Sequence, residues 1–346
     1  MSVHIDPNKP VFGESQWITS EDVNVEHLLD VFTTIDASSD DIWVACPKFI
    51  RHLFWHKGRF TILRPKIEGL PDDHRSKPKC LFELSQLLQS GGKQVERKRL
   101  LTHTLKLWKE RGNECGVAGT LQHLSDVNRI MGLYKEGVQQ VKEASGIFKR
   151  IGNTVAQGEC LIVLGLLLDL DNQLDAAEEA AFCAINLFSG KGQRHHICQS
   201  HRLLGNIYRS KGEIEKAVHH FEVALGIASP SNWHEQLVFL HYALAETFLN
   251  EGRFRDAQAH IKCAKLHALN HTYFLGDLME LQAKLWYKQD RLEEARSGAL
   301  RAVDVFEKLG AIRGLERCSG VLQWIEGGMS KPVIPNEPTD GSEFLV

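Results

Sequence analysis

The sequence lacks the features that mark membrane, secreted or disulfide-rich proteins. Its longest apolar run, Cys160 to Leu168, is too short to cross a bilayer and is followed by Asp169. The opening residues, MSVHIDPNKP, contain no apolar stretch of the kind that a secretory signal needs. The eight cysteines stand singly, without a CxxC pair, which is typical of reduced thiols and not of a disulfide framework or zinc site. We therefore expect a cytoplasmic protein.

The sequence also lacks an excess of charge of one sign. Of its 346 residues, 43% are hydrophobic and 25% are charged, and the formal net charge is -3. These values are typical of a soluble, folded protein. Binding to nucleic-acid phosphates needs a basic surface, which this balance does not indicate. We therefore expect neither nucleic acid nor membrane as a partner.

Motifs that carry catalysis are absent from the sequence, which contains no GxxxxGK[ST], no GxSxG and no HExxH. The segment SGKGQR, residues 189–194, lacks the first glycine and the hydroxyl residue of a phosphate-binding loop. The densest groups among the 17 histidines are His195-His196 with His201, and His219-His220. Adjacent histidines on a helix point about 100° apart, which is poor geometry for sharing one metal ion. The absence of motifs does not exclude an enzyme, but it offers no catalytic residue, cofactor site or metal site, and we predict a non-catalytic protein.

What the sequence does contain is a short phrase repeated at a fixed interval. LWKERGN, IFKRIGN and LFSGKGQ begin at Leu107, Ile147 and Leu187, which are 40 residues apart. In the same register, a leucine followed by a small residue recurs at Leu84, Leu124, Leu164, Leu204 and Leu244. Large residues three positions beyond the small one fall on the same face of a helix. Each unit is therefore predicted to contain a first helix, which we name helix A.

A turn and a second helix, helix B, are predicted to follow in each unit. Seven residues after the small residue stand types that tolerate a left-handed backbone, at Gly92, Gly132, Asn172, Gly212, Gly252 and Asp290. Small residues that let two helices approach closely recur in helix B, at Ala144, Ala177, Ala184, Ala217, Ala224, Ala257, Ala264, Ala295 and Ala302. The repeated phrase ends helix B at Gly112, Gly152 and Gly192. Six copies in register favour stacked helix hairpins over unrelated amphipathic helices.

These residues resemble a known family. The pattern of the tetratricopeptide repeat is matched by Leu204-Gly205, Tyr208, Ala217, Phe221, Ala224 and Pro230. The period of 40 resembles a longer-helix subtype found in partner-binding scaffolds and in sensor arms of signalling NTPases. In the first unit, Arg97 and Thr104 stand where small residues are expected. The resemblance covers about Pro78 to Glu326 and implies an all-α, right-handed superhelical tetratricopeptide-like solenoid of about six helix hairpins with capping helices.

A narrower resemblance is to repeat arrays of mushroom-type fungal proteins. It is carried by HLFWHKGRFTILRPKIEGLPDDHRSKPKCLFELSQLL, by ERKRLLTHTLKLWKERGN and by GEIEKAVHHFEVALGIAS. In those proteins the repeats often follow an NTPase module of the NACHT or NB-ARC-like class, which this sequence does not contain. This resemblance implies an alternative function, a regulatory or sensor subunit of an NTPase-based signalling system whose catalytic module lies on another chain.

The two ends of the sequence differ from the repeats in composition. We expect a disordered segment over residues 1–25, a helical capping segment over 26–77 with a short amphipathic helix near Phe49 to Phe54, the repeat array over 78–326, and a disordered tail over 327–346. The array is expected to close with a helix around Leu315 to Ile325. Acidic residues dominate through Asp41 and basic residues from Lys48 to Lys79, a reversal that fits either an ordinary surface or a partner site.

The family resemblance also implies which side chains line the concave groove of the solenoid. The implied groove residues are Arg129, Ile162, Leu166, Arg202, Asn206, Arg209, Tyr242, Glu246 and Lys284. The stripe of Arg202, Asn206 and Arg209 can hold an acidic group through charge-assisted hydrogen bonds. The alternative is that its arginines only pair with Glu246 or Asp169 of adjacent units. We predict a non-catalytic scaffold or adaptor that binds a protein or peptide, of an oligomeric state that the sequence does not indicate.

Overall fold

The computed structural model describes residues 60–88, 93–190, 192–268, 272–309 and 311–327. The chain divides into two compact units, residues 1–87 and 88–346. The described residues form fourteen α-helices and one short 3-10 helix, with no strand among them. The all-α class is therefore confirmed, and the predicted segment boundaries stay predictions.

Two helices of the first unit are described, α3 (Phe60–Gly69) and α4 (Lys77–Leu87), and they pack against each other. Buried Lys77 donates from Nζ to Asp72 Oδ1 at 2.7 Å and to the carbonyl of Leu70, which ties the start of α4 to the loop before it. Residues 1–59 lie outside the described part of the chain. The predicted disordered segment 1–25 and the predicted amphipathic helix near Phe49 to Phe54 lie there.

The second unit is a series of helix hairpins between α5 (Gln94–Glu110) and α16 (Ile312–Gly327). The hairpins are α6 (Glu114–Ile130) with α7 (Tyr134–Arg150), α8 (Thr154–Leu170) with α9 (Leu174–Ser189), α10 (Arg194–Ser210) with α11 (Ile214–Ala228), α12 (His234–Asn250) with α13 (Phe254–His267), and α14 (Thr272–Lys288) with α15 (Leu292–Leu309). The 3-10 helix η1 (Ser229–Ser231) follows α11. Helices α6, α8, α10 and α12 begin at residues 114, 154, 194 and 234, which confirms the interval of 40.

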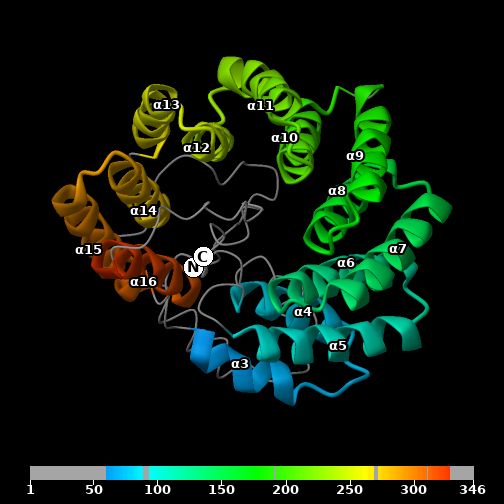
Figure 1. Cartoon of the computed structure of the whole chain (residues 1–346). Coiled ribbons are helices and arrows are strands. Elements are labelled where there is room, and N and C mark those ends of the chain that lie inside the picture. Colours follow the sequence, from blue (N-terminus) through cyan, green and yellow to red (C-terminus); the bar gives the residue numbers. More distant parts are fainter. Residues whose placement is uncertain (1–59, 89–92, 191, 269–271, 310, 328–346) are drawn as a thin grey trace, which may run out of the picture. The chain divides into compact units, whose positions relative to one another are not determined.

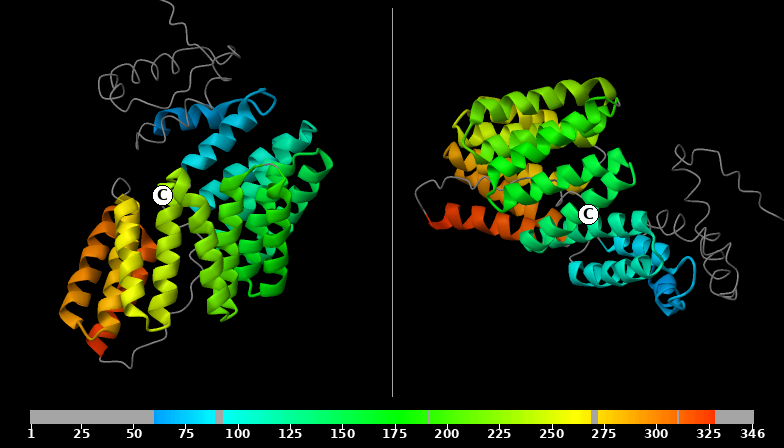
Figure 2. Two further views of the ribbon diagram at one scale, coloured as in Figure 1. Left: turned by 90° about the horizontal axis from the view of Figure 1, so that it is seen from above. Right: turned by 90° about the vertical axis from the view of Figure 1, so that its right-hand side faces the viewer.

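The hairpins of the second unit stand side by side in two layers (Figures 1 and 2). Each helix A packs on its own helix B, and the series α6, α8, α10, α12, α14 and α16 also makes contacts from one member to the next. The helices B are α7, α9, α11, α13 and α15. Each packs on the helix A of its own hairpin and on the helix A that follows it, and together they lie on the outer side of the curve in Figure 1. The helices A therefore form an inner layer with a face of its own, which we call the inner face.

The turns confirm the predicted left-handed positions. Within the hairpins, φ is positive at Gly132 (74°), Asn172 (58°), Gly212 (77°), Gly252 (72°) and Asp290 (62°). Between hairpins it is positive at Gly112 (63°), Gly152 (75°) and Gly192 (65°). A residue with a Cβ is strained in this region, and asparagine and aspartate tolerate it best. Gly92 lies outside the described residues. The first predicted hairpin consists of α4 and α5, which belong to different units, so this hairpin stays a prediction.

The repeated phrase also caps the helix that follows it, a role that was not predicted from the sequence. The side-chain oxygens of Asn113 and Asn153, which end the first two copies, accept hydrogen bonds from the backbone nitrogens of Gly116 at 2.8 Å and Ala156 at 3.1 Å. Such a cap satisfies a backbone N–H group that the first turn of a helix leaves open and is worth about 1 kcal/mol. Gln193, which ends the third copy, makes no such bond. The phrase therefore ends one hairpin and starts the next.

Small residues set the distance between helix A and helix B. The nine predicted alanines, Ala144, Ala177, Ala184, Ala217, Ala224, Ala257, Ala264, Ala295 and Ala302, are all completely buried. A Cβ atom at Gly205 of α10 would lie 2.5 Å from Cδ1 and 2.8 Å from Cζ of Phe221 in α11. At Gly158 of α8 it would lie 2.8 Å from Cε1 of Phe188 in α9. A phenyl ring from helix B therefore fills the space that a side chain on helix A would need.

The C-terminal end of the array confirms one prediction and leaves another untested. The closing helix expected around Leu315 to Ile325 is α16, which packs on both α14 and α15. Residues 328–346, which make up nearly all of the predicted disordered tail, lie outside the described part of the chain. Within the described ranges, no helix combines the length and apolar character needed to span a bilayer.

Candidate functional site

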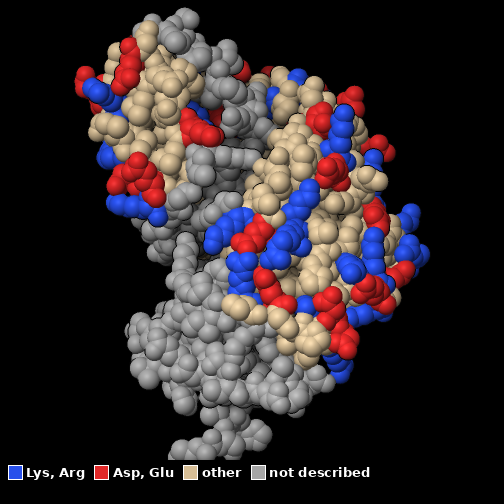
Figure 3. Space-filling view, turned by 90° about the horizontal axis from the view of Figure 1, so that it is seen from below, with Lys and Arg blue, Asp and Glu red and all other residues tan. Residues whose placement is uncertain are grey.

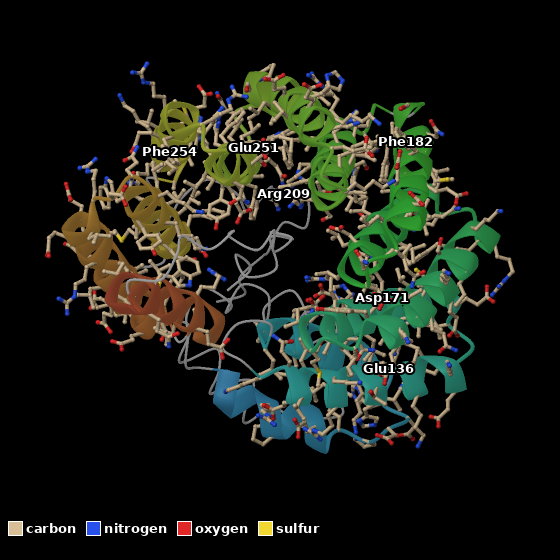
Figure 4. The ribbon with its side chains drawn as sticks, viewed as in Figure 1. Glu136, Asp171, Phe182, Arg209, Glu251 and Phe254 are labelled. Atoms are coloured by element: carbon tan, nitrogen blue, oxygen red, sulfur yellow. The ribbon has the colours of Figure 1, made fainter. Side chains whose placement is uncertain are left out.

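The nine predicted groove residues all lie on helices A. Arg129 is on α6, the pair Ile162 and Leu166 is on α8, and the others lie on α10, α12 and α14. None of the nine is more than 9% exposed. Figure 4 shows Arg209 on the inner side of the curve of helices. Their assignment to a ligand groove stays a prediction.

At the first end of the inner face, two arginines share one carboxylate. Arg97 of α5, which is fully buried, donates from Nη1 to Asp126 Oδ2 at 3.2 Å, and Arg129 donates from Nη2 to Asp126 Oδ1 at 2.6 Å. Burial alone would raise the pKa of Asp126, but the two arginines hold it below its usual value. Burial lowers the pKa of Arg97. Arg97 was not predicted as a site residue, although its presence where the repeat has a small residue was a signal.

In the middle of the inner face, an ion pair joins α10 to α12. Arg209 donates from Nη1 to Glu246 Oε2 and contacts Asn206 Oδ1 from Nη2 at 3.4 Å. Arg209 and Glu246 are 1% and 3% exposed, so the pair is buried. Burial raises the pKa of Asp169 on α8, although the charge of Arg209 acts in the opposite direction. The pairing that the alternative interpretation anticipated for Arg209 is therefore present.

Arg202 has a different environment from Arg209. Its guanidinium carbon lies 5.2 Å from the centre of the Phe239 ring on α12, a distance typical of a cation–π contact. Burial lowers the pKa of Arg202, the charge of Glu235 opposes this, and the charge of Arg129 lowers it further. The helix α8, which carries the apolar pair Ile162 and Leu166, packs on both α6 and α10, the helices that carry Arg129 and Arg202.

At the last end of the inner face, acidic and basic side chains are matched. Lys284 Nζ lies 2.7 Å from Glu280 Oε1, and Arg317 of α16 donates from Nε to Glu280 Oε2 at 2.8 Å and also pairs with Asp277. Burial alone would raise the pKa of Glu280, but Lys284 and Arg317 hold it below its usual value. Arg317 was not predicted as a site residue, although it follows Asp277 by one repeat interval.

The charged residues of the inner face therefore link successive helices A and do not form a surface of one sign. Basic and acidic side chains are also interleaved on the face shown in Figure 3. Ion pairs join α5 to α6, α10 to α12 and α14 to α16. A further pair, Arg129 with Asp126, lies within α6.

Histidines form pairs between the two helices of a hairpin. Nδ1 of His201 lies 3.0 Å from Nδ1 of His220, and one repeat later Nδ1 of His241 lies 2.9 Å from Nδ1 of His260. At such distances one imidazole donates a hydrogen bond to the other, which requires both rings to be neutral or only one to be protonated. Among the described residues, no three His, Cys, Asp or Glu side chains are grouped so that they can hold a metal ion.

Acidification is expected to destabilise these hairpins. Burial, together with neighbouring histidines, lowers the pKa of His220 and that of His241 from 6.5 to about 4. As the pH falls below about 6.5, the unfolded chain binds protons that the folded chain does not, so stability present above this pH is lost down to about pH 4. We expect the urea midpoint to fall between pH 7 and pH 5, and to fall less in the variant His220→Phe/His241→Phe. If the urea midpoint fell equally in the wild type and in this variant, groups other than His220 and His241 would cause the loss of stability.

Comparison with known sequences gives limited similarity. No protein-family model matches the sequence. The chain is similar to Protein KINESIN LIGHT CHAIN-RELATED 3 of Arabidopsis thaliana, with 22% identity over 208 residues, which cover 57% of this chain and 32% of that protein. The chain thus spans about a third of the length of the curated relative that it matches.

Solved structures are similar over most of the chain. A Rap protein complexed with Competence and Sporulation Factor has a TM-score of 0.63 at 13% identity and covers 90% of this chain and 93% of its own. A tetratricopeptide repeat protein from Parabacteroides merdae has a TM-score of 0.60 at 14% identity, with coverage of 82% and 98%. Aspartyl phosphate phosphatase F from Bacillus subtilis has a TM-score of 0.56 at 10% identity, with coverage of 90% and 89%. At these identities the likeness concerns the fold, and the fold of this chain is a tetratricopeptide-like solenoid.

Proposed function

We propose that this chain is a non-catalytic scaffold or adaptor that binds a protein or peptide on its inner face. The observation that carries the proposal is the packing of α6 and α10, which carry Arg129 and Arg202, on α8, which carries Ile162 and Leu166. The charge of Arg129 disfavours that of Arg202, and Asp126 already pairs with Arg129. A ligand carboxylate would add a further charge-assisted contact, and the apolar pair on α8 suits an apolar side chain. A ligand segment with acidic and apolar residues satisfies both requirements.

The names of the similar proteins support a binding role. One neighbour is a Rap protein in complex with Competence and Sporulation Factor, and the curated relative carries the name of a kinesin light chain. Another neighbour is named as an aspartyl phosphate phosphatase, but the sequence of this chain contains no catalytic motif on which a reaction would rest. We therefore assign it a binding function in the cytoplasm, with the 40-residue repeat subtype as its architecture.

The test substitutes Arg129 and Arg202 together, and urea unfolding of the variant checks that it is folded. Substitution of Arg209 would leave Glu246 buried without its ion pair, so it would report on stability as well as binding. Arg129→Gln leaves Asp126 paired with Arg97, and Arg202→Gln keeps a polar side chain over Phe239. The matched control is Arg255→Gln/Arg301→Gln on the outer helices α13 and α15, where both arginines are exposed.

We expect the variant Arg129→Gln/Arg202→Gln to lose affinity for its partner. Partners captured quantitatively from native lysate by the wild-type chain would be purified and their Kd values measured. Loss of a charge-assisted hydrogen bond corresponds to a tenfold or greater increase in Kd, and the Arg255/Arg301 control should match the wild type. If the wild type, the variant and the control bound the partner with equal affinity, the binding site would not include Arg129 and Arg202. The next candidate is the stretch within residues 26–79 where acidic residues give way to basic ones.

The alternative function, a regulatory or sensor subunit of an NTPase-based signalling system, rests on the sequence resemblance to fungal NTPase-linked arrays. It predicts that the chain co-purifies in a stable complex with an NTPase chain and changes the rate at which that chain hydrolyses nucleotide. Captured partners that are all without NTPase activity would contradict it.

A further inference from the structure

We propose that two pairs of histidines in the second unit bind divalent transition-metal ions of the class that prefers imidazole, such as Ni²⁺ and Cu²⁺. The pairs are His201 of α10 with His220 of α11 and His241 of α12 with His260 of α13. The prediction of a protein without a metal was made from neighbours in the sequence, whereas the partners of each pair are 19 residues apart. None of the four histidines is among the predicted groove residues, so the proposal does not depend on the proposed function.

The ring nitrogens of each pair are separated by the distance that such an ion requires. The two Nδ1 atoms lie 3.0 Å apart in the pair of His201 and His220, and 2.9 Å apart in the pair of His241 and His260. A metal–imidazole bond is about 2.0–2.1 Å long, so two imidazoles bound at a right angle have nitrogens about 2.8–3.0 Å apart. The tetrahedral geometry of Zn²⁺ would place them about 3.3–3.4 Å apart. The two distances therefore fit the tetragonal geometry of Cu²⁺ and Ni²⁺ without separation of the helices.

Binding of an ion requires a change of tautomer but no loss of a proton from the pair. Without metal, the Nδ1–H group of one ring donates a hydrogen bond to Nδ1 of the other. With metal, both Nδ1 atoms donate their lone pairs to the ion, and the donor ring carries its proton on Nε2 instead. The ion exchanges two water ligands for the two nitrogens. It keeps water at its other positions, because no three His, Cys, Asp or Glu side chains of the described ranges can hold one ion together.

The rings of both pairs are accessible and neutral. All four histidines are half-buried, so the imidazoles can turn until their lone pairs converge on an ion. Burial, together with neighbouring histidines, lowers the pKa of His220 and that of His241 to about 4. At pH 7 these rings therefore carry no charge, which is the state in which imidazole binds a metal.

Carboxylates near the pairs favour the charge of a bound cation. Burial lowers the pKa of His260, but the charges of Asp256 and Glu222 act in the opposite direction. Asp256 also pairs with Arg253, whose side chain is 57% exposed and therefore screened by water. At the first pair, the charge of Glu178 favours a positive charge on the ring of His220. Each pair therefore lies in a field that partly offsets the charge of a divalent ion.

The fold does not require histidine at these positions. The residues 40 positions before the first pair are Leu161 and Ala180 of the hairpin α8–α9, and those 80 positions before it are Leu121 and Gln140 of the hairpin α6–α7. Leu121 and Ala180 are buried in the core, and Leu161 packs against it. Apolar packing therefore joins the two helices there without histidine. A bound ion accounts for the pairing of two imidazoles at the same place in both later hairpins.

The test measures Ni²⁺ binding to full-length chains by isothermal titration calorimetry at pH 7. Ni²⁺ is the probe because, unlike Cu²⁺, it does not oxidise the exposed cysteines. The variants are His201→Gln, His241→Gln and the two together. The matched control is His195→Gln/His219→Gln, which removes the same number of histidines from exposed positions of α10 and α11.

We expect the variant His201→Gln/His241→Gln to bind Ni²⁺ about tenfold or more weakly than the wild type, because each pair keeps only one of its two ligands. Each single variant should lose one of two tight sites, and the control should match the wild type. Equal binding by the double variant and the wild type would overturn the proposal. An equal loss in the double variant and the control would also overturn it.

A second measurement uses the wild-type chain and does not depend on the folding of the variants. An ion that joins two helices binds the folded chain more tightly than the unfolded chain and so stabilises it. We expect the urea midpoint of the wild type to rise with Ni²⁺ and not with Mg²⁺, which prefers oxygen ligands. A midpoint that is unchanged by Ni²⁺, or that rises equally with Mg²⁺, would contradict the proposal.

Discussion

Gly205→Val is expected to lower the free energy of unfolding by about 3 kcal/mol, because it forces a side chain into a space that Phe221 already fills. A Cβ atom at this position would lie 2.5 Å from Cδ1 of Phe221, and the ring is completely buried. The ring has no solvent to move into, so α10 and α11 must separate. Urea unfolding followed by circular dichroism measures the effect.

The control for this prediction is Gly226→Val in α11 of the same hairpin. Gly226 is exposed, and a Cβ atom there would meet nothing within 4 Å. Because valine forms helices slightly better than glycine, this substitution should change the free energy of unfolding by less than about 1 kcal/mol. Equal free energies of unfolding for the two variants would contradict the close packing of α10 against α11 at Gly205.

Glu246→Leu is expected to destabilise the protein by about 3–5 kcal/mol, the usual consequence of breaking a buried ion pair from one side. Arg209 would keep its contact with Asn206 at 3.4 Å but would remain charged in a site where it is only 1% exposed. The loss arises from desolvation of the guanidinium group, which Glu246 offsets in the wild type. The same urea titration measures it.

Two further variants separate the ion pair from other effects of the substitution. Arg209→Met/Glu246→Leu removes both charges and should recover most of the lost stability, since apolar residues of similar volume often replace a buried pair without loss. Asp304→Asn breaks a pair with Lys308 whose side chains are 62% and 72% exposed, and should change stability by less than about 1 kcal/mol. A small effect of Glu246→Leu, like that of Asp304→Asn, would show that the pair is not buried.

The ion pair also affects how Arg209 can serve binding. The sequence left open whether this arginine lines a groove or pairs with Glu246, because both interpretations require the same face of α10. In the structure Arg209 forms the pair with Glu246, while Arg202 lies over the ring of Phe239 on α12. A substitution of Arg209 would therefore change stability as well as any binding.

The hairpins could be predicted from the amino-acid sequence, because the features that define them are local. A left-handed turn admits few residue types, so Gly132, Asn172 and Gly212 mark the turns, where φ is indeed positive. Close packing of two helices admits only small residues, so the alanines of helix B mark the core. Each requirement concerns one backbone position or one pair of adjacent helices, and it recurs every 40 residues.

The pairing of the charged side chains on the inner face could not be predicted from the sequence. Arg97 reaches Asp126, Arg209 reaches Glu246, and Arg317 reaches Glu280, each across a boundary between helices that belong to different hairpins or caps. The repeat interval predicts which helices are neighbours, but several acidic residues on each neighbour lie within reach of a long arginine side chain. The choice among them depends on side-chain rotamers and on the burial of each group, which are set by packing in three dimensions and leave no periodic pattern in the sequence.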